Sequence, residues 1–302
     1  MTGGNEMDWT IENGRHALEK MQQRASCRSF ADRDIPEDVL KSVLETGIRA
    51  ATGGNLQPYS IIVVKDKERK EKLAELNENQ RFMAQAPVNL VFVLDWYKNG
   101  RLAELQKAPY TASESYMHFL IGVEDVMCAA QSIETAAWLM GIGSVYIGTS
   151  NHAGRGMAEL LELPEHTYPV VILTMGYPKN EVKTRERLPY GMTVFEEKYP
   201  KLSDEDIQDG FSQKYGRMER DLSKAPDVRK EIMDRMRAAL LTTYSAEETG
   251  KILEEIETSG RYKEYQYRFG LHYHAAEMPE LGTDIMEMMK EQGLEPFKRL
   301  KK

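Results

Sequence analysis

The sequence contains little cysteine, and its two cysteines stand alone. Cys27 and Cys128 are the only ones among 302 residues, and neither lies in a CxxC pair or beside a histidine. This pattern argues against a zinc or iron–sulfur site and is typical of a protein of a reducing compartment. The six histidines include His272 and His274 in a Leu-His-Tyr-His run. No carboxylate or cysteine stands near them at ligand spacing, so we interpret them as packed or exposed side chains and expect no metal.

Long apolar runs are also missing. The most apolar stretch, residues 121–142, is interrupted by four polar side chains and does not reach the roughly 18 apolar residues that a membrane-spanning helix needs. These four are Glu124, Asp125, Gln131 and Glu134. Residues 1–13 are polar and contain no apolar segment typical of a signal peptide. We therefore expect a cytoplasmic protein that does not enter a membrane.

The chain has no excess of positive charge. Its 40 lysines and arginines are outnumbered by 48 aspartates and glutamates, which gives a formal net charge of −8. This balance argues against a general affinity for nucleic acid or anionic membranes. Any phosphate-binding site must then be a local concentration of cations within a chain that is acidic overall.

No internal repeat or low-complexity linker divides the chain, and its elements alternate. A helix opens at Pro36 and carries apolar residues at helical spacing to Ile48. Apolar and β-branched segments predict strands at 60–64, 89–94, 144–148 and 168–175. A helix of small and flexible residues is expected at 122–141, and its apolar stripe fits either core packing or a subunit interface. Interspersed strands and helices indicate a layered sheet with helices on its faces.

The character of the chain changes near residue 200. Residues 201–302 are densely charged, with helical spacing and almost no strand pattern. Helices are expected at 227–241, 246–259 and 283–292. We predict a core over residues 1–200 and a helical extension over 201–302 that wraps around the core or a partner chain.

Two arginines flank a serine in Arg24-Ala25-Ser26-Cys27-Arg28. Placed four apart on one face of a helical turn, Arg24 and Arg28 could bind the oxygens of a phosphate together with Ser26. The alternative is an ordinary solvated basic face.

Three later segments can complete such a site. The loop 53–59 has two glycines that permit close backbone approach, and Asn55 and Gln57 carry amides able to bind the edge of a heterocycle. Residues 143–149 end a strand with glycine and can offer free backbone N–H groups. Gly176-Tyr177-Pro178 is followed by Lys183, Arg185 and Arg187, which could reach an anion. Taken singly, these segments are also compatible with plain turns and a solvated loop.

In this order and spacing the four segments resemble the FMN-dependent nitroreductase family over roughly residues 16–200. The chain looks most similar to the branch of bacterial oxygen-insensitive nitroreductases and NAD(P)H:flavin oxidoreductases. Two stretches support that choice. One is residues 80–87, and the other is Tyr146-Ile147-Gly148 together with the later Arg-x-Arg-Leu-Pro of residues 185–189. The tail resembles this branch to about Arg217 and then departs, with extra residues around 218–258 whose role is open.

The resemblance implies an α+β fold of three layers, in which helices flank a mixed, mostly antiparallel sheet. It also implies an intertwined homodimer with FMN at the subunit interface. Whether the helical tail contacts its own or the partner subunit is open.

The resemblance also assigns residues to the cofactor. Arg24, Ser26 and Arg28 would hold the FMN phosphate and the pyrimidine side of the ring, and both arginines would help to set its reducing power. Asn55 and Gln57 would reach the ring from the partner subunit, and Gln80 would contact it. The remaining implied residues are Tyr146, Ile147, Gly148 and Thr149 under the ring, with backbone N–H groups of Gly148 or Thr149 near flavin N5, and Arg185 and Arg187 at the phosphate.

The activity implied is transfer of two electrons from NADH or NADPH to a nitroaromatic, a quinone or free flavin by a ping-pong mechanism. Flavin N5 carries the chemistry, so no catalytic side chain is expected. Reductive dehalogenation, oxidative breakdown of the flavin and ene reduction are related alternatives, and residues 97–116 could form a short lid. A non-catalytic flavin- or partner-binding protein is another alternative, with the tail as its functional part. Arg217, Arg220 and Arg261 are candidates for an NADPH 2′-phosphate site, but the choice of nucleotide is left open.

Overall fold

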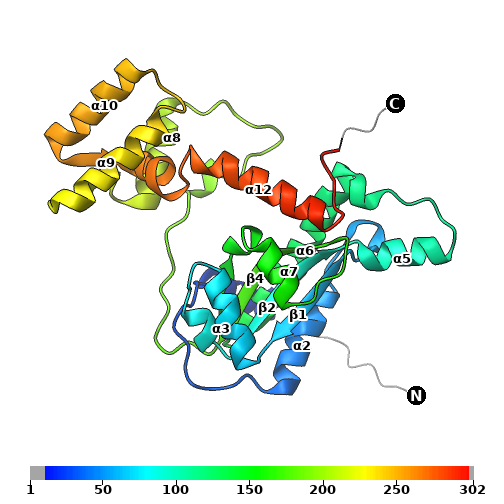
Figure 1. The fold of residues 1–302 in the computed structure, drawn as a ribbon. Helices are drawn as coiled ribbons and strands as arrows, with labels where there is room; N and C mark the ends of the chain where they lie inside the picture. Colours follow the sequence, from blue (N-terminus) through cyan, green and yellow to red (C-terminus); the bar gives the residue numbers. More distant parts are fainter. Residues whose placement is uncertain (1–10, 299–302) are drawn as a thin grey trace. The chain divides into compact units, whose positions relative to one another are not determined.

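The computed structural model describes residues 11–298, and the chain forms two compact units (Figure 1). Of the described residues, 11–184 and 284–298 form the first unit and 185–283 form the second. The division therefore differs from the predicted one, since the first unit ends before residue 200 and regains the last segment of the chain. Met288, Met289 and Leu294 explain this return, because they pack in one buried cluster with Leu94 and Trp96 of the sheet region.

A four-stranded sheet forms the centre of the first unit. Its strands are β1 (Tyr59–Val64), β2 (Val88–Asp95), β3 (Gly143–Ile147) and β4 (Thr167–Gly176), in the order β1-β2-β4-β3. Every neighbouring pair is antiparallel. The four predicted strands are confirmed to within one residue at each end. The central strand β2 is buried along its whole length, whereas β1 and β3 form the edges.

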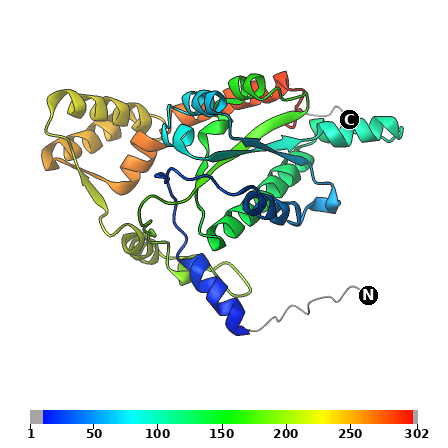
Figure 2. The ribbon, with the colours of Figure 1, turned by 90° about the horizontal axis from the view of Figure 1, so that it is seen from below.

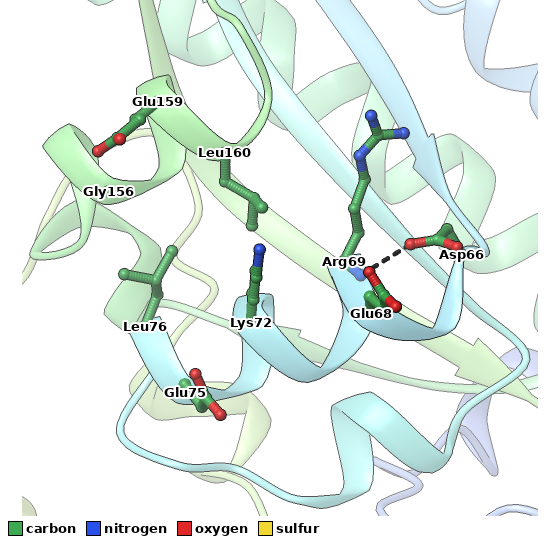
Figure 3. A pocket seen from close by; sticks show the side chains of 9 residues that line it. All are labelled: Asp66, Glu68, Arg69, Lys72, Glu75, Leu76, Gly156, Glu159 and Leu160. Carbon is green, nitrogen blue, oxygen red and sulfur yellow. Dashed lines mark hydrogen bonds between the residues drawn. The ribbon is translucent and has the colours of Figure 1, made fainter.

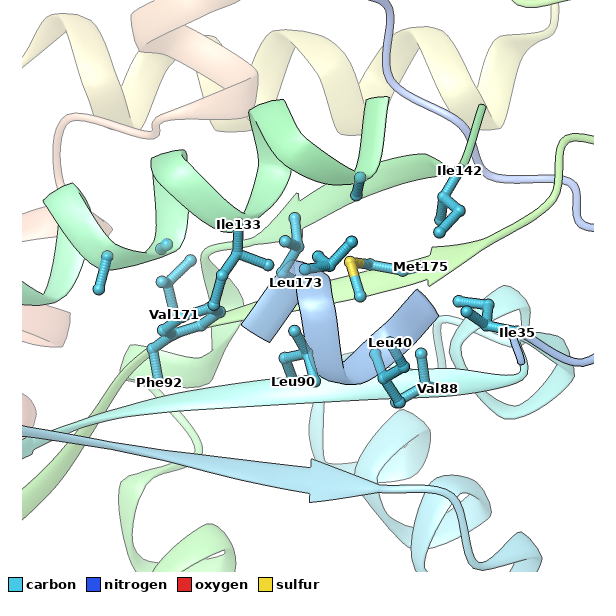
Figure 4. Packing of buried hydrophobic residues seen from close by; sticks show 14 of the residues in the cluster. Ile35, Leu40, Val88, Leu90, Phe92, Ile133, Ile142, Val171, Leu173 and Met175 are labelled. Carbon is cyan, nitrogen blue, oxygen red and sulfur yellow. The ribbon is translucent and has the colours of Figure 1, made fainter. Parts of the chain in front are cut away.

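Helices cover both faces of this sheet. The first unit contains the helices α1 (Ile11–Gln22), α2 (Glu37–Ile48), α3 (Lys67–Leu76), α4 (Phe82–Gln85), α5 (Tyr97–Leu105), α6 (Tyr116–Leu139) and α7 (Gly154–Leu160). Leu90, Phe92 and Leu173 pack against α2 and α6 on one face (Figure 4). Val91 and Ile172, which alternate with them, pack against α3 and α7 on the other face. Figure 2 shows the sheet between these helices, which confirms the layered α+β fold.

The long helix α6 serves both the core and the surface. Ala130, Ile133 and Ala137 are fully buried, so core packing accounts for the middle of the predicted stripe. Met127 and Met140, toward the two ends of the same stripe, are 36% and 54% exposed. Gly47 of α2 allows close approach, because a Cβ at this position would lie 2.4 Å from Ile133 Cγ1. None of the helices within residues 11–298 has the length and apolar character needed to cross a bilayer.

The second unit is mainly helical. It contains α8 (Asp204–Tyr215), α9 (Pro226–Leu240), α10 (Ala246–Ser259) and α11 (Glu264–Tyr267), while α12 (Glu277–Glu291) begins in it and ends in the first unit. The predicted helices at 227–241 and 246–259 are confirmed. The third predicted helix, at 283–292, corresponds only to the later part of α12. A short antiparallel ladder of β5 (Glu219–Asp221) and β6 (Arg261–Lys263) was not predicted, because three-residue strands rich in charge show no apolar alternation.

A buried carboxylate fastens this ladder. Glu264 is 2% exposed and accepts hydrogen bonds from Arg220 Nε at 2.6 Å and Arg220 Nη2 at 3.1 Å. Arg268 Nε donates to the same carboxylate at 2.9 Å. The hydrogen bonds from Arg220 hold the pKa of Glu264 below its usual value, and the charges of both arginines act in the same direction.

Glutamine at position 264 should destabilise the second unit in a pH-dependent way. The pKa of Glu264 is lower in the folded state, so its stabilisation is present above the unfolded pKa and is lost as the pH falls through the folded pKa. We expect Glu264→Gln to lower the free energy of unfolding by about 1–2 kcal/mol at pH 7 and by much less in acid. Urea unfolding at both pH values measures this. Glu257→Gln, in an exposed pair with Arg229, is the control and should change little. Equal losses at both pH values would contradict the assignment.

Candidate functional site

The segment 24–28 lies along the free edge of the sheet. Ser26 forms an isolated parallel bridge with Ser144 of β3, and Cys27 N donates to Ser144 O at 2.8 Å. The predicted helical turn is therefore wrong, because α1 ends at Gln22 and the following backbone pairs with an edge strand. Extended backbone nevertheless leaves alternate side chains on one side. Ser26 and Arg28 are exposed, while Cys27 is buried.

Arg24, the third member of the motif, forms an ion pair with a buried side chain. Its Nε contacts the carboxylate of Glu134 on α6, and its Nη1 lies 3.4 Å from Ser26 Oγ. Glu134 is 1% exposed and also accepts from Ser144 Oγ at 3.2 Å and from Gln131 Nε2 at 2.9 Å. In the sequence, Glu134 stands out only as a polar interruption of an apolar stretch. That position was the available signal, since an acid inside a core helix requires a buried partner.

The end of β3 supplies the next predicted residues. Ile147 is buried, and Tyr146 is half-buried with its hydroxyl buried and without a hydrogen-bond partner within residues 11–298. Burial raises the pKa of the Tyr146 phenol, and the charge of Glu134 raises it further. Gly148 is exposed, with no atom within 4 Å of the place where a Cβ would lie. The strand thus ends beside open space bordered by backbone.

A chain of hydrogen bonds joins Gln80 to this strand end. Gln80 Nε2 donates to Thr149 Oγ1 at 3.2 Å, and Thr149 Oγ1 donates to Asn77 Oδ1 at 3.0 Å. Asn77 is fully buried and donates from Nδ2 to Leu73 O at 2.8 Å. The structure therefore brings together Gln80 and Thr149, two of the residues that the resemblance assigns to the cofactor. Asn77, which fixes both, was missed because a single buried amide leaves no pattern in the sequence.

The glycine-rich loop lies at the other edge of the sheet. Gly54, Asn55 and Gln57 have positive φ angles of 58°, 57° and 47°, and the loop leads directly into β1. Gly53 N donates to the buried carboxylate of Asp125 at 2.9 Å, which fixes the loop to α6. Since β1 and β3 are the outer strands of four, the two edges are about 14 Å apart. One chain therefore does not bring Asn55 and Gln57 beside segment 24–28.

The fourth predicted segment begins next to the first. Ala31 N donates to Tyr177 O at 2.8 Å, and Lys179 N donates to Ser29 O at 3.0 Å. Beyond this contact, Arg185 and Arg187 are exposed residues of the second unit. Their share in phosphate binding stays a prediction.

The arginines proposed for NADPH selection are engaged with acids inside the second unit. Arg217 Nη2 lies 2.8 Å from Asp221, and Arg261 Nη1 lies 3.3 Å from Glu219. Arg220 binds Glu264 as described above. Their charges are thus largely balanced locally, and a role in nucleotide choice stays a prediction.

His272 and His274 also lie in the second unit. The His272 ring stacks on Tyr267 with centroids 6.0 Å apart, and His274 is buried with Nε2 2.9 Å from Arg235 O. In the described part of the chain, no three histidine, cysteine or acidic side chains gather as metal ligands would.

The first unit also contains a charged groove. It has a volume of about 930 Å³ and is formed by α3 and α7 (Figure 3). Asp66 and Arg69 at its rim are joined by a helix-capping hydrogen bond, from Arg69 N to Asp66 Oδ1. Four of its lining side chains are acidic and two are basic, namely Asp66, Glu68, Glu75, Glu159, Arg69 and Lys72. This groove contains none of the residues predicted to bind a cofactor.

The residues at the β3 edge fit a flat anionic cofactor such as FMN. Ser26 and Arg28 are exposed cofactor-binding candidates that can bind phosphate oxygens. Gly148 leaves the space that a planar ring needs, and the unpaired Tyr146 hydroxyl offers a donor that a ligand could satisfy.

Known proteins similar to this chain point to one family. The model of the nitroreductase family matches residues 21–177. An NADPH-dependent oxidoreductase of Staphylococcus saprophyticus is 34% identical over 196 residues, which cover 64% of this chain and 77% of that protein. The NADPH-flavin oxidoreductase of Vibrio harveyi is 29% identical over 240 residues, covering 80% and 92% respectively. A solved structure of the Vibrio harveyi NADPH:FMN oxidoreductase with NAD⁺ is similar with a TM-score of 0.61 and 27% identity, covering 81% of this chain and 97% of that one.

Proposed function

The chain belongs to the nitroreductase family as an oxidoreductase of the flavin-reductase type, and we propose that it uses FMN to pass two electrons from NADH or NADPH to a small acceptor. Nitroaromatics, quinones and free flavin are the proposed acceptors. The observation that carries the proposal is the β3 edge, where exposed Ser26 and Arg28 lie beside a strand that ends in open space at Gly148.

Each part of this edge has a task in the proposal. Arg24, Ser26 and Arg28 would hold the phosphate and the pyrimidine side of FMN, and the resemblance assigns Arg185 and Arg187 to the same phosphate. The backbone N–H groups of Gly148 and Thr149 would serve the ring, and Gln80, whose amide Thr149 holds, would contact it. Tyr146 and Ile147 support the ring from the strand.

Bound FMN would supply the chemistry of hydride acceptance and two-electron delivery. The chain itself positions the ring and leaves one face open for the nucleotide and then for the acceptor. Because both reactants use the same face in turn, we expect ping-pong kinetics. No side chain has to act as nucleophile, acid or base.

A homodimer would complete this site. The loop with Asn55 and Gln57 lies at the opposite edge from segment 24–28, so a second copy is needed to bring the two together. Exposed apolar side chains on and beside α6 support such a contact, among them Met117 at 62% and Met140 at 54% exposure. Cross-linking or size-exclusion chromatography measures this state, and a monomer that retains FMN would contradict it.

Purified protein tests the main proposal directly. We expect a yellow protein whose flavin absorbance is bleached without oxygen by NADH, by NADPH or by both, and is restored by a nitroaromatic or a quinone. A protein that neither contains FMN nor binds added FMN would overturn the proposal. Flavin that neither nucleotide bleaches would favour a binding protein without turnover, and selective oxidation by a halotyrosine or an enone would favour reductive dehalogenation or ene reduction.

A further inference from the structure

A buried carboxylate lies directly behind the first arginine of the site. Glu134 contacts Arg24 Nε and accepts hydrogen bonds from Ser144 and Gln131, so its oxygens are bound by three side chains. The Arg24 side chain is 23% exposed, whereas the Glu134 side chain is 2% exposed. The Arg24–Glu134 pair thus connects the buried side of α6 to the sheet edge where segment 24–28 lies.

This contact changes what Arg24 can contribute. An arginine bound to a buried carboxylate forms a neutral pair, and its field at a neighbouring group is much weaker than that of a free cation. Arg28, by contrast, is exposed. Of the two arginines predicted to act alike, Arg24 is held and neutralised by Glu134.

We propose that Glu134 is a positioning residue that fixes Arg24 beside the cofactor and cancels its charge, and so keeps the reduction potential of bound FMN low. The inference rests on the proposed function, because it requires FMN at the β3 edge. It revises the expectation that both arginines favour reduction, since this effect is assigned to Arg28 alone.

The physical reason is electrostatic. Two-electron reduction adds negative charge to a bound flavin, so a net positive charge nearby favours the reduced form. Glu134→Gln keeps the shape of the side chain and leaves the charge of Arg24 unpaired in a partly buried place, where salt screens it little. The reduced form should then bind about tenfold more tightly relative to the oxidised form, which corresponds to a midpoint potential about 30 mV more positive.

The experiment measures the midpoint potential of FMN-loaded protein by anaerobic equilibration with a reference dye. Glu134→Gln should shift the potential to more positive values. Glu134→Asp keeps the charge and should stay near the wild type. Glu124→Gln removes an equal charge from an exposed position on α6, about 15 Å away along the helix axis, and should also have little effect. Equal potentials for Glu134→Gln and the wild type would overturn the inference.

A double variant separates charge from packing. Arg24→Gln combined with Glu134→Gln removes both charges and should return the potential to that of the wild type. If Glu134→Gln does not fold, the potentials of the double variant and of Glu134→Asp together test the inference. A potential more negative than that of the wild type in the double variant would show that Arg24 acts as a free cation in the wild type, and would overturn the inference. A wild-type protein that binds no FMN would instead overturn the proposed function.

Discussion

Alanine at position 28 should weaken FMN binding by about 10- to 100-fold. Arg28 is exposed beside the bridge between Ser26 and Ser144, and within residues 11–298 no acid forms an ion pair with it as Glu134 does with Arg24. A charge-assisted hydrogen bond to a phosphate contributes about 1.5–3 kcal/mol, which is the basis of the expected loss. Fluorescence titration of apoprotein with FMN measures the dissociation constant.

Arg33 provides the matched control for this change. It belongs to the same stretch of chain, but its guanidinium lies 4.1 Å from the centroid of the Tyr177 ring, in a contact that needs no cofactor. Arg33→Ala should therefore leave FMN affinity close to that of the wild type. Normal flavin content in Arg28→Ala, or equal losses in both variants, would count against the assignment of Arg28.

Alanine at position 148 should impair FMN binding by about 10- to 100-fold without harming the fold. No atom lies within 4 Å of the added methyl group, and the φ angle of −85° is one that alanine readily adopts. The folded protein should be as stable as the wild type or up to about 1 kcal/mol more stable, because alanine restricts the unfolded chain. The methyl group would instead occupy the space proposed for the ring, where overpacking costs about 1–3 kcal/mol.

Two measurements on the same variant separate these effects. Urea unfolding of the apoprotein reports stability, and FMN titration reports the site. Gly250→Ala, within α10 and likewise with nothing within 4 Å of its Cβ, is the control: FMN affinity should remain that of the wild type, while stability should rise by about 0.5–1 kcal/mol because alanine is the better helix former. If Gly148→Ala binds FMN as tightly as the wild type, the ring does not lie against this strand end.

Much of the fold could be predicted because the signal was local. The strand at 88–95 contains an uninterrupted apolar run at 90–94, and such a run predicts a strand buried on both faces. The helix at 246–259 could be placed to the residue, since Ser245 and Glu248 form a capping box at its start and Gly260 ends it in a left-handed conformation. Its apolar residues follow helical spacing between these signals.

The candidate site was predicted less completely, because its supporting contacts join distant residues. The motif 24–28 was recognised, but its helical turn was wrong, since pairing with β3 is a tertiary event that sequence spacing does not report. Glu134 and Asn77 contact residues that are 110 and 72 positions away in the chain. Their role follows from burial, and a single acid or amide in a sequence does not reveal whether it is buried.

The sequence by itself determined the layered sheet, the helices around it and the residue types that can bind an anionic heterocycle. Periodicity, capping and residue chemistry are local properties, and they act before the chain folds. Only the tertiary structure decided which cations remain free, because Arg24 meets Glu134 while Arg28 stays exposed. It also decided that Asn55 and Gln57 lie at the opposite edge of the sheet, since strand order is fixed by burial of both faces and not by the spacing of motifs along the chain.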